Sequence, residues 1–237
     1  MKDLYVFCEG ATEQGFVNQV LRPHLYPLGF TNVPTIQVAF SKHHGVVKRG
    51  GVRAYGPVRK DILNHTKQRG TSPGVFYTTM IDLYGLPMDF PGRQSNVRDT
   101  EDPIPYVEAL EAAFGIDIGD RRFIPYLQLH EYETLLFSDP NAFAATFENA
   151  EPAIAQLHSI AGSVSSVELI DDGEESAPSK RIIQHLPAYK GRKSSAGPDV
   201  AERIGLAVLR AKCLHFDSWI RRLEALEPLP PSTPLPV

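Results

Sequence analysis

Three short apolar runs, each ending abruptly at an acidic residue, constrain this chain more than any other feature. The runs and the acids that follow them are Leu4–Cys8 with Glu9, Val75–Ile81 with Asp82, and Phe123–Leu129 with Glu131 just beyond His130. Short runs rich in β-branched, aromatic and aliphatic residues predict buried strands. A further strand is expected over Pro34–Phe40.

Segments with helical spacing of apolar residues alternate with these strands in the first half and follow one another in the second. The expected helices cover residues 12–21, Val58–Arg69, Pro103–Phe114, Pro140–Ala161 (with breaks), Ala201–Leu214 and Phe216–Leu226. This alternation predicts an α/β fold with a mostly parallel sheet flanked by helices, followed by a helical C-terminal extension. We therefore expect one domain over residues 1–226 and a Pro-rich tail over residues 227–237.

Composition places the chain among ordinary globular proteins. Its 237 residues are 42% hydrophobic, which is enough for a sizeable core without disulfides or structural metals. Cys8 and Cys213 form no CxxC pair, so reduced thiols and a cytoplasmic location are expected. No signal peptide and no apolar run of about 18 residues is visible, which predicts no membrane association. The net charge of −4 means that nucleic-acid binding would need a local basic patch.

The acids at the strand ends carry the main chemical prediction. In parallel sheets, ligands bind at the carboxyl ends of the strands, so these acids should converge on one edge. Converging carboxylates repel one another, and Mg²⁺ or Mn²⁺ would relieve that repulsion and support phosphodiester cleavage. The alternative is that each acid is a solvated loop residue or a helix cap. The candidate metal ligands are Glu9, Asp82, Glu131 and Glu133.

Two further residues are candidates for proton transfer beside Glu9. Glu13 lies four residues after Glu9, at the start of the first predicted helix, where it could equally favour the helix dipole. His130 is a candidate general base or metal ligand, because the imidazole side chain of histidine commonly serves in both roles, although a hydrogen bond to a nearby loop explains it as well. Both residues are kept as catalytic candidates.

Basic residues suggest places where phosphate could bind. Ser179, Lys180 and Arg181 follow a proline and begin a predicted helix, where backbone amides and cations attract phosphate. Lys190 lies in a second basic turn with Arg192 and Lys193. Lys42, Lys48 and Arg49 lie in a Gly-rich basic loop, and could extend the same patch. Solvated surface charge is the competing interpretation for all of them.

Several segments resemble a known family. Cys8–Glu13 is similar to the glutamate signature that opens Toprim-like domains, which occur in topoisomerases, primases and overcoming-lysogenization-defect nucleases. The whole chain, over roughly residues 3–225, resembles the bacterial domain of unknown function 4276 family. The segments that carry this resemblance are Thr79–Pro87, Leu129–Phe137, Ala177–Arg181 and Cys213–Trp219.

The resemblance implies roles for two of the acids. Glu9 matches the Toprim glutamate, which acts as a metal ligand or general acid/base, and Asp82 matches the first aspartate of the Toprim pair. Tyr84 stands where the second aspartate is expected. Glu131 and Glu133 would then supply the missing oxygen ligands, with Asp89 as a weaker substitute.

The function implied by the resemblance is a metal-dependent nuclease or phosphotransfer protein acting on DNA or RNA. Relatives often accompany an ABC-type ATPase in bacterial defence or mobile-element loci, and this chain has no P-loop of its own. A non-catalytic nucleic-acid-binding or regulatory subunit with a degenerate site is the main alternative. A phosphohydrolase of small nucleotides is a third option, and self-association of the chain stays open.

Overall fold

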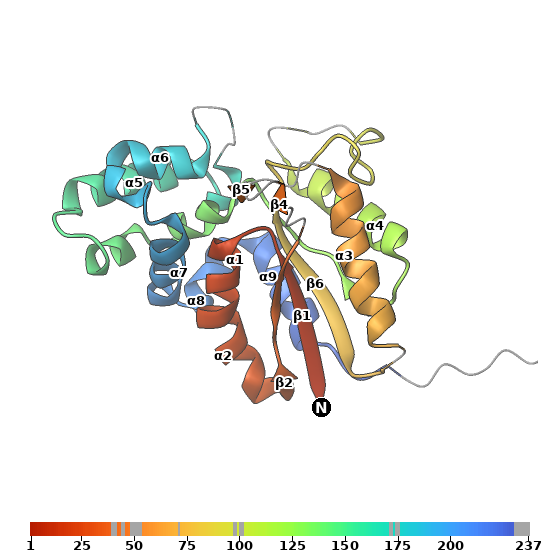
Figure 1. Cartoon of the computed structure of the whole chain (residues 1–237). Coiled ribbons are helices and arrows are strands. Elements are labelled where there is room, and N and C mark those ends of the chain that lie inside the picture. The colour runs from red at the N-terminus through yellow and green to blue at the C-terminus, as the bar shows by residue number, and fades with distance from the viewer. Residues whose placement is uncertain are drawn as a thin grey trace, which may run out of the picture.

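A parallel sheet with helices on both faces organises the chain (Figure 1). The computed structural model describes residues 1–38, 42–43, 46–47, 54–70, 72–96, 99, 102–170, 173 and 176–229. The strands described there are β1 (Lys2–Cys8), β2 (Phe30–Asn32), β3 (Thr35–Gln37), β6 (Val75–Asp82), β7 (Phe123–Ile124) and β8 (Leu127–Gln128). They form a six-stranded sheet in the order β2-β1-β6-β7, with β3 also beside β1 and β8 also beside β6.

All pairings in this sheet are parallel, as the alternation of strands and helices predicted. The described residues also include a small antiparallel pair, β4 (Lys42–His43) with β5 (Val46–Val47). The predicted basic loop around this pair and the last eight residues of the Pro-rich tail lie outside the described residues.

The helices lie on both faces of the sheet and in a C-terminal group. They are α1 (Ala11–Phe16), α2 (Arg22–Leu25), α3 (Tyr55–Gln68), α4 (Ile104–Ile118), α5 (Glu151–Gly162), α6 (Pro178–His185), α7 (Lys193–Ile204), α8 (Leu206–Lys212) and α9 (Leu214–Glu224). A π-helical turn over Val17–Leu21 joins α1 to α2. Single 3₁₀ segments cover Tyr26–Leu28, Tyr132–Ser138, Pro140–Ala145, Val167–Leu169 and Pro187–Tyr189. Across the described ranges, no helix has the length and apolar character needed to span a membrane.

Strand β1 contributes side chains to two separate hydrophobic cores because its side chains alternate between the faces of the sheet. Leu4, Val6 and Cys8 pack with residues of α1 and α9, whereas Tyr5 and Phe7 pack with residues of α3 and α4. Figure 1 shows the same division, with α3 and α4 on one side of β1 and β6 and with α1 and α9 on the other. A strand buried on both faces explains why the run is continuously apolar rather than alternating.

The structure corrects the boundaries of several predicted elements. The strand predicted over Phe123–Leu129 is two short strands, because Pro125 has no amide and Tyr126 donates its amide to the Thr79 hydroxyl. The strand predicted over Pro34–Phe40 covers only Thr35–Gln37 among the described residues.

The predicted C-terminal helices are also divided differently. The helix expected over Ala201–Leu214 is two helices that meet at Gly205, whose φ of 79° interrupts the right-handed helix. Helix α4 is longer than predicted and ends at Gly119 in the left-handed region.

Trp219 anchors helix α9 to the sheet through an aromatic stack and a hydrogen bond. The Trp219 ring stacks on Tyr126 with centroids 4.1 Å apart, and its indole N–H donates to the Thr78 hydroxyl over 2.9 Å. Trp219 and Phe216 are both buried, so they belong to the core rather than to a base-stacking surface.

Replacing this anchor should destabilise the fold strongly. Trp219→Ala is expected to lower the free energy of unfolding by about 3–5 kcal/mol, because it empties a fully packed site. Urea unfolding followed by circular dichroism measures the change. Leu214→Ala in the same helix is the control, since Leu214 is 66% exposed and its replacement should cost less than about 0.5 kcal/mol. Equal effects of the two substitutions would contradict this account of the packing.

Candidate functional site

The carboxyl ends of three neighbouring strands meet at one edge of the sheet. Strand β6 lies between β1 and β8, and both pairings are parallel. Glu9 therefore follows the end of β1, Asp82 is the last residue of β6, and Glu131 comes shortly after β8. The structure thus brings the three predicted strand-end acids to the same edge, which we call the acidic edge.

Glu9 and Asp82 are joined directly at the acidic edge by a hydrogen bond. The Asp82 amide donates to Glu9 Oε2 over 3.2 Å. The Asp82 Oδ1 atom is buried and, in the described part of the chain, accepts no hydrogen bond. A buried carboxylate oxygen without a donor is costly, and such atoms call for an explanation in terms of strain, an ion or chemistry.

Glu13 lies beneath this pair, at the start of α1. Its side chain is 6% exposed, and its Oε2 accepts the Gly10 amide over 2.7 Å, so Glu13 does cap the helix as one sequence interpretation suggested. Burial, and next the charge of Glu9, raise the pKa of Glu13 from its ordinary 4.5 to about 7. Capping and a pKa near neutrality therefore occur in one residue.

The carboxylates at the acidic edge act on one another electrostatically. Burial raises the pKa of Asp82 well above its ordinary range, and the charges of nearby glutamates raise it further; these are Glu9, Glu13, Glu133 and Glu131, in order of effect. Like charges that share a buried site disfavour the ionised form of each. Without a cation, the acidic edge therefore retains protons at pH values where isolated carboxyl groups have lost them.

Glu131 and Glu133 have partners of their own in the helical C-terminal part. Glu131 Oε2 accepts the Ser179 amide at the start of α6 over 2.9 Å. Glu133 is 5% exposed, forms an ion pair with Lys193 Nζ at 3.3 Å, and accepts the Tyr189 hydroxyl at 3.3 Å. Burial nevertheless raises the pKa of Glu133, and Lys193 opposes that rise.

The partners of Glu131 and Glu133 matter for the predicted metal site, because that site would use both residues as ligands together with Glu9 and Asp82. Across the residues that the structure describes, no group of three or more Asp, Glu, His or Cys side chains is arranged to hold a metal ion. Glu9 and Asp82 are adjacent, whereas Glu131 and Glu133 are directed to α6 and α7. Asp89, the weaker substitute, accepts the Tyr55 amide at the start of α3.

His130 holds an unusual backbone conformation at the end of β8. Its φ is 64°, in the left-handed region that non-glycine residues rarely adopt, and its side chain is 3% exposed. The His130 carbonyl accepts the Tyr84 amide over 3.0 Å, which ties the loop after β6 to the end of β8. Strained residues of this kind cluster at functional sites, where the surrounding structure holds them in place.

The backbone amides of the predicted phosphate-binding group have partners within the protein. The Ser179 amide donates to Glu131, and the Lys180 and Arg181 amides donate to the Ala177 carbonyl. The start of α6 therefore binds a carboxylate of the protein, and phosphate binding by this group stays a prediction. The side chains of Lys180 and Lys190 are exposed and stay candidates.

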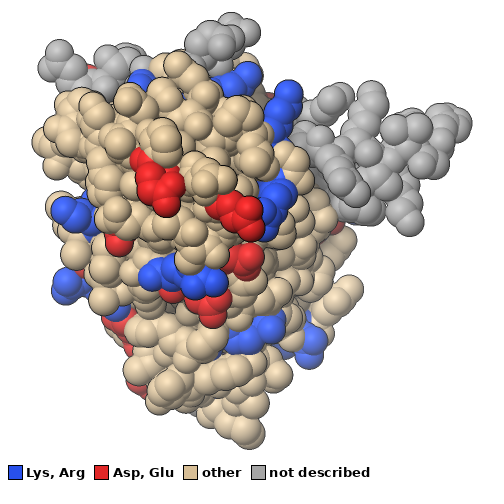
Figure 2. Space-filling view, turned by 90° about the vertical axis from the view of Figure 1, so that its left-hand side faces the viewer, with Lys and Arg blue, Asp and Glu red and all other residues tan. Residues whose placement is uncertain are grey.

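Surface charge near these helices is mixed. Figure 2 shows Lys and Arg interspersed with Asp and Glu on this face rather than gathered into one basic patch. Lys48 and Arg49 lie outside the described residues, as does the side chain of Lys42, so the extended patch predicted from the sequence stays a prediction.

Three residues near the acidic edge have roles that no sequence pattern predicts. The sequence associates Lys193 only with phosphate, whereas in the structure Lys193 balances the charge of Glu133. Tyr189 donates to the same carboxylate, and the buried Tyr132 hydroxyl has no hydrogen-bond partner within the described ranges. Lys193 and Tyr189 lie some sixty residues from Glu133 in the sequence, so no local pattern could have joined them.

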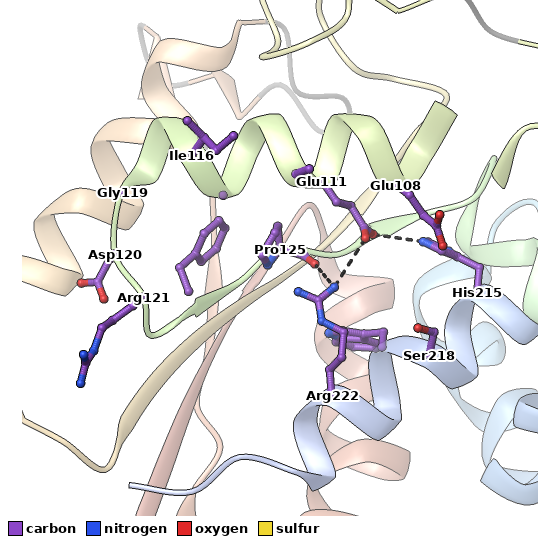
Figure 3. Close-up of a pocket in the computed structure, with 14 residues that line it drawn as sticks. Glu108, Glu111, Ile116, Gly119, Asp120, Arg121, Pro125, His215, Ser218 and Arg222 are labelled. Atoms are coloured by element: carbon purple, nitrogen blue, oxygen red, sulfur yellow. Dashed lines mark hydrogen bonds and ion pairs between the residues drawn. The ribbon is translucent and has the colours of Figure 1, made fainter. Parts of the chain in front are cut away.

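A cavity lies elsewhere in the described part of the chain, between α4 and α9 at the β7 edge of the sheet (Figure 3). It has a volume of about 610 Å³. Glu111 Oε1 accepts the Leu127 amide over 2.9 Å and lies 3.2 Å from His215 Nε2, while Arg222 Nη1 donates to the Pro125 carbonyl. These contacts hold α4, α9 and the broken strand together. Glu111, His215 and Arg222 therefore have structural roles in this cavity, and the acidic edge is the better candidate for a catalytic site.

The fold and the acidic edge define a class: an α/β protein with a parallel sheet and buried carboxylates at the carboxyl ends of its central strands. A family model described as "Domain of unknown function (DUF4276)" matches residues 8–224, and the chain belongs to this family. No curated protein and no solved structure matches the chain.

The raised pKa of Glu13 predicts a specific dependence of stability on pH. In the metal-free protein, the proton on Glu13 is held more tightly in the folded state than in the unfolded chain. The stabilisation of the folded state by this proton is fully present below pH 4.5 and is lost as the pH rises through about 7. The difference between these pKa values corresponds to about 3 kcal/mol. The free energy of unfolding should fall between pH 5 and 8, and less steeply in Glu13→Gln.

Urea unfolding in EDTA, followed by the fluorescence of the single tryptophan, measures this slope. Glu151→Gln is the control, because Glu151 is an exposed residue in the first turn of α5 and should leave the slope unchanged. A Glu13→Gln protein with the wild-type slope would show that Glu13 is ionised normally.

Proposed function

We propose that this chain is a Toprim-like phosphodiesterase that acts on nucleic acid and depends on Mg²⁺ or Mn²⁺. The observation that carries the proposal is the environment of Asp82. Its buried Oδ1 atom lacks a donor among the described residues, and its backbone amide donates to the Glu9 carboxylate. Glu13, Glu131 and Glu133 surround this pair with further negative charge. Such an arrangement is unfavourable unless a cation or a proton neutralises it.

The residues fit Mg²⁺ in a particular way. Mg²⁺ in proteins is commonly bound by one or two carboxylates, with waters and substrate phosphates completing its shell. Glu9 and Asp82 would hold the ion, and the requirement for only two carboxylates agrees with the lack of a larger ligand group in the described ranges. A bound ion of this kind supplies activation of water and charge stabilisation in phosphodiester cleavage.

The other residues would support the chemistry from fixed positions. Glu13, whose pKa is raised to about 7, can accept or donate a proton near neutral pH, as a general acid or base requires. Glu131 and Glu133 connect the acidic edge to α6 and α7 through the Ser179 amide and through Lys193. His130 holds the loop after β6 against the end of β8.

A second candidate function is a non-catalytic nucleic-acid-binding or regulatory subunit. Two observations favour it: Tyr84 stands where the Toprim pair has its second aspartate, and both later glutamates have protein partners. In this function the acidic edge would bind divalent cations weakly and cut nothing. The ATPase partner implied by the family resemblance would then supply the catalytic step.

Cleavage of labelled DNA and RNA by the purified protein tests the proposal. We expect cutting with Mg²⁺ or Mn²⁺, none with EDTA, and a rate at least about 100-fold lower in Asp82→Asn, equivalent to about 3 kcal/mol of transition-state stabilisation. Asp89→Asn is the matched control, since Asp89 lies in the following loop and bonds the Tyr55 amide.

Two results would overturn this assignment. Full activity in Asp82→Asn would place the chemistry elsewhere, and cutting in EDTA would exclude the metal requirement. No cutting by wild type, with or without an added ATPase partner, would favour the non-catalytic subunit. Hydrolysis of mononucleotides in preference to polymers would identify a small-molecule phosphohydrolase.

A further inference from the structure

The loop after β6 presents two large hydrophobic side chains to solvent beside the acidic edge. Tyr84, two residues beyond Asp82, is 48% exposed, and Met88 in the same loop is 63% exposed. Aromatic and soft apolar side chains exposed next to a candidate active site are typical of surfaces that contact a substrate.

The backbone that carries Tyr84 is held firmly. Its amide donates to the His130 carbonyl over 3.0 Å, and the preceding Leu83 amide donates to the Gln128 carbonyl over 2.9 Å. The loop therefore continues the pairing of β6 with β8 beyond the end of the sheet. An aromatic ring on a fixed backbone loses little conformational entropy when a flat ligand stacks on it.

A small cavity of about 60 Å³ adjoins the ring, lined by Leu83, Tyr84, Leu86, Arg93 and Tyr106. The Nη1 atom of this Arg93 is buried and, within the described ranges, has no hydrogen-bond partner. An arginine nitrogen in that state is matched by an anionic oxygen, and the planar guanidinium group is well suited to phosphate.

The cavity and the acidic edge lie on either side of the same loop. A Cβ atom built on Gly85 would lie 3.8 Å from Glu9 Oε1, while the flanking Tyr84 and Leu86 line the cavity. A ligand that covers Tyr84 would therefore lie one residue along the loop from Gly85, which borders the Glu9 carboxylate. Arg93 also supplies local positive charge in a chain whose net charge is −4.

We propose that Tyr84 and Arg93 form a subsite for one nucleotide of single-stranded nucleic acid. The base stacks on the Tyr84 ring with Met88 alongside, and a phosphate oxygen accepts a hydrogen bond from Arg93. The face of a base is accessible in a single strand but covered in a duplex, so the subsite selects single strands. Its position relative to a scissile bond rests on the proposed function, whereas binding itself needs no metal.

Fluorescence anisotropy in EDTA tests this subsite, with a labelled oligodeoxythymidine of about 15 nucleotides as the probe. We expect Tyr84→Ala to weaken binding about tenfold and Tyr84→Phe to preserve it, because stacking needs the ring and not the hydroxyl. Tyr26→Ala is the matched control: Tyr26 is also 48% exposed but precedes β2, which pairs with the first residues of β1. The Tyr26→Ala protein should bind the probe with the affinity of wild type.

Arg93→Ala provides a second, independent measure. It should weaken binding and reduce the slope of log affinity against log salt by about 0.7, the amount expected when one phosphate contact is lost on a single strand. A duplex of the same length should bind more weakly than the single strand. Equal affinities of Tyr84→Ala and Tyr26→Ala, or a duplex bound as tightly as the single strand, would overturn the proposal.

The outcome can be separated from that of the phosphodiesterase proposal. Tyr84-dependent binding without metal-dependent cutting would support the subsite and reject the enzyme. Metal-dependent cutting with binding unaffected by Tyr84→Ala would support the enzyme and reject the subsite.

Discussion

The parallel pairing of β1 with β6 is the interaction on which the other features depend. It runs from Asp3 opposite Val75 to Cys8 opposite Met80, so β6 ends only two residues beyond the end of β1. This register places the Glu9 side chain within hydrogen-bond distance of the Asp82 amide, and the buried faces of the two strands anchor α1 and α9 on one side and α3 and α4 on the other. A shift in this register would separate the two acids and expose apolar side chains on both faces.

Two buried carboxylates elsewhere in the chain have hydrogen-bond donors that compensate for the loss of water. Glu168, which is fully buried, accepts the His215 and Phe216 amides at the start of α9. Glu111 accepts the Leu127 amide and lies 3.2 Å from His215. Asp82 differs, because its buried Oδ1 has no donor in the described part of the chain and its neighbours are negatively charged. That contrast distinguishes the acidic edge from the structural glutamates.

Much of the fold could be predicted because its signals are local. The central strands, the parallel sheet and the acids at the strand ends follow from short apolar runs and from alternation with helices. The break at Pro125 was harder to predict, since the neighbouring apolar residues continue the strand pattern on both sides of it. The partners of Glu131 and Glu133 could not be predicted, because they come from α6 and α7, about 50 and 60 residues further on.

By itself, the sequence determined which residues form the central strands and that acids follow them, because strand formation depends on the order of apolar side chains along a few residues. Only the tertiary structure decided what each acid does. Glu131 holds the start of α6, Glu133 pairs with Lys193, and Asp82 retains a buried oxygen without a donor in the described residues. The physical reason is that compensation of a buried charge depends on distance in space, which the order of residues along the chain does not specify.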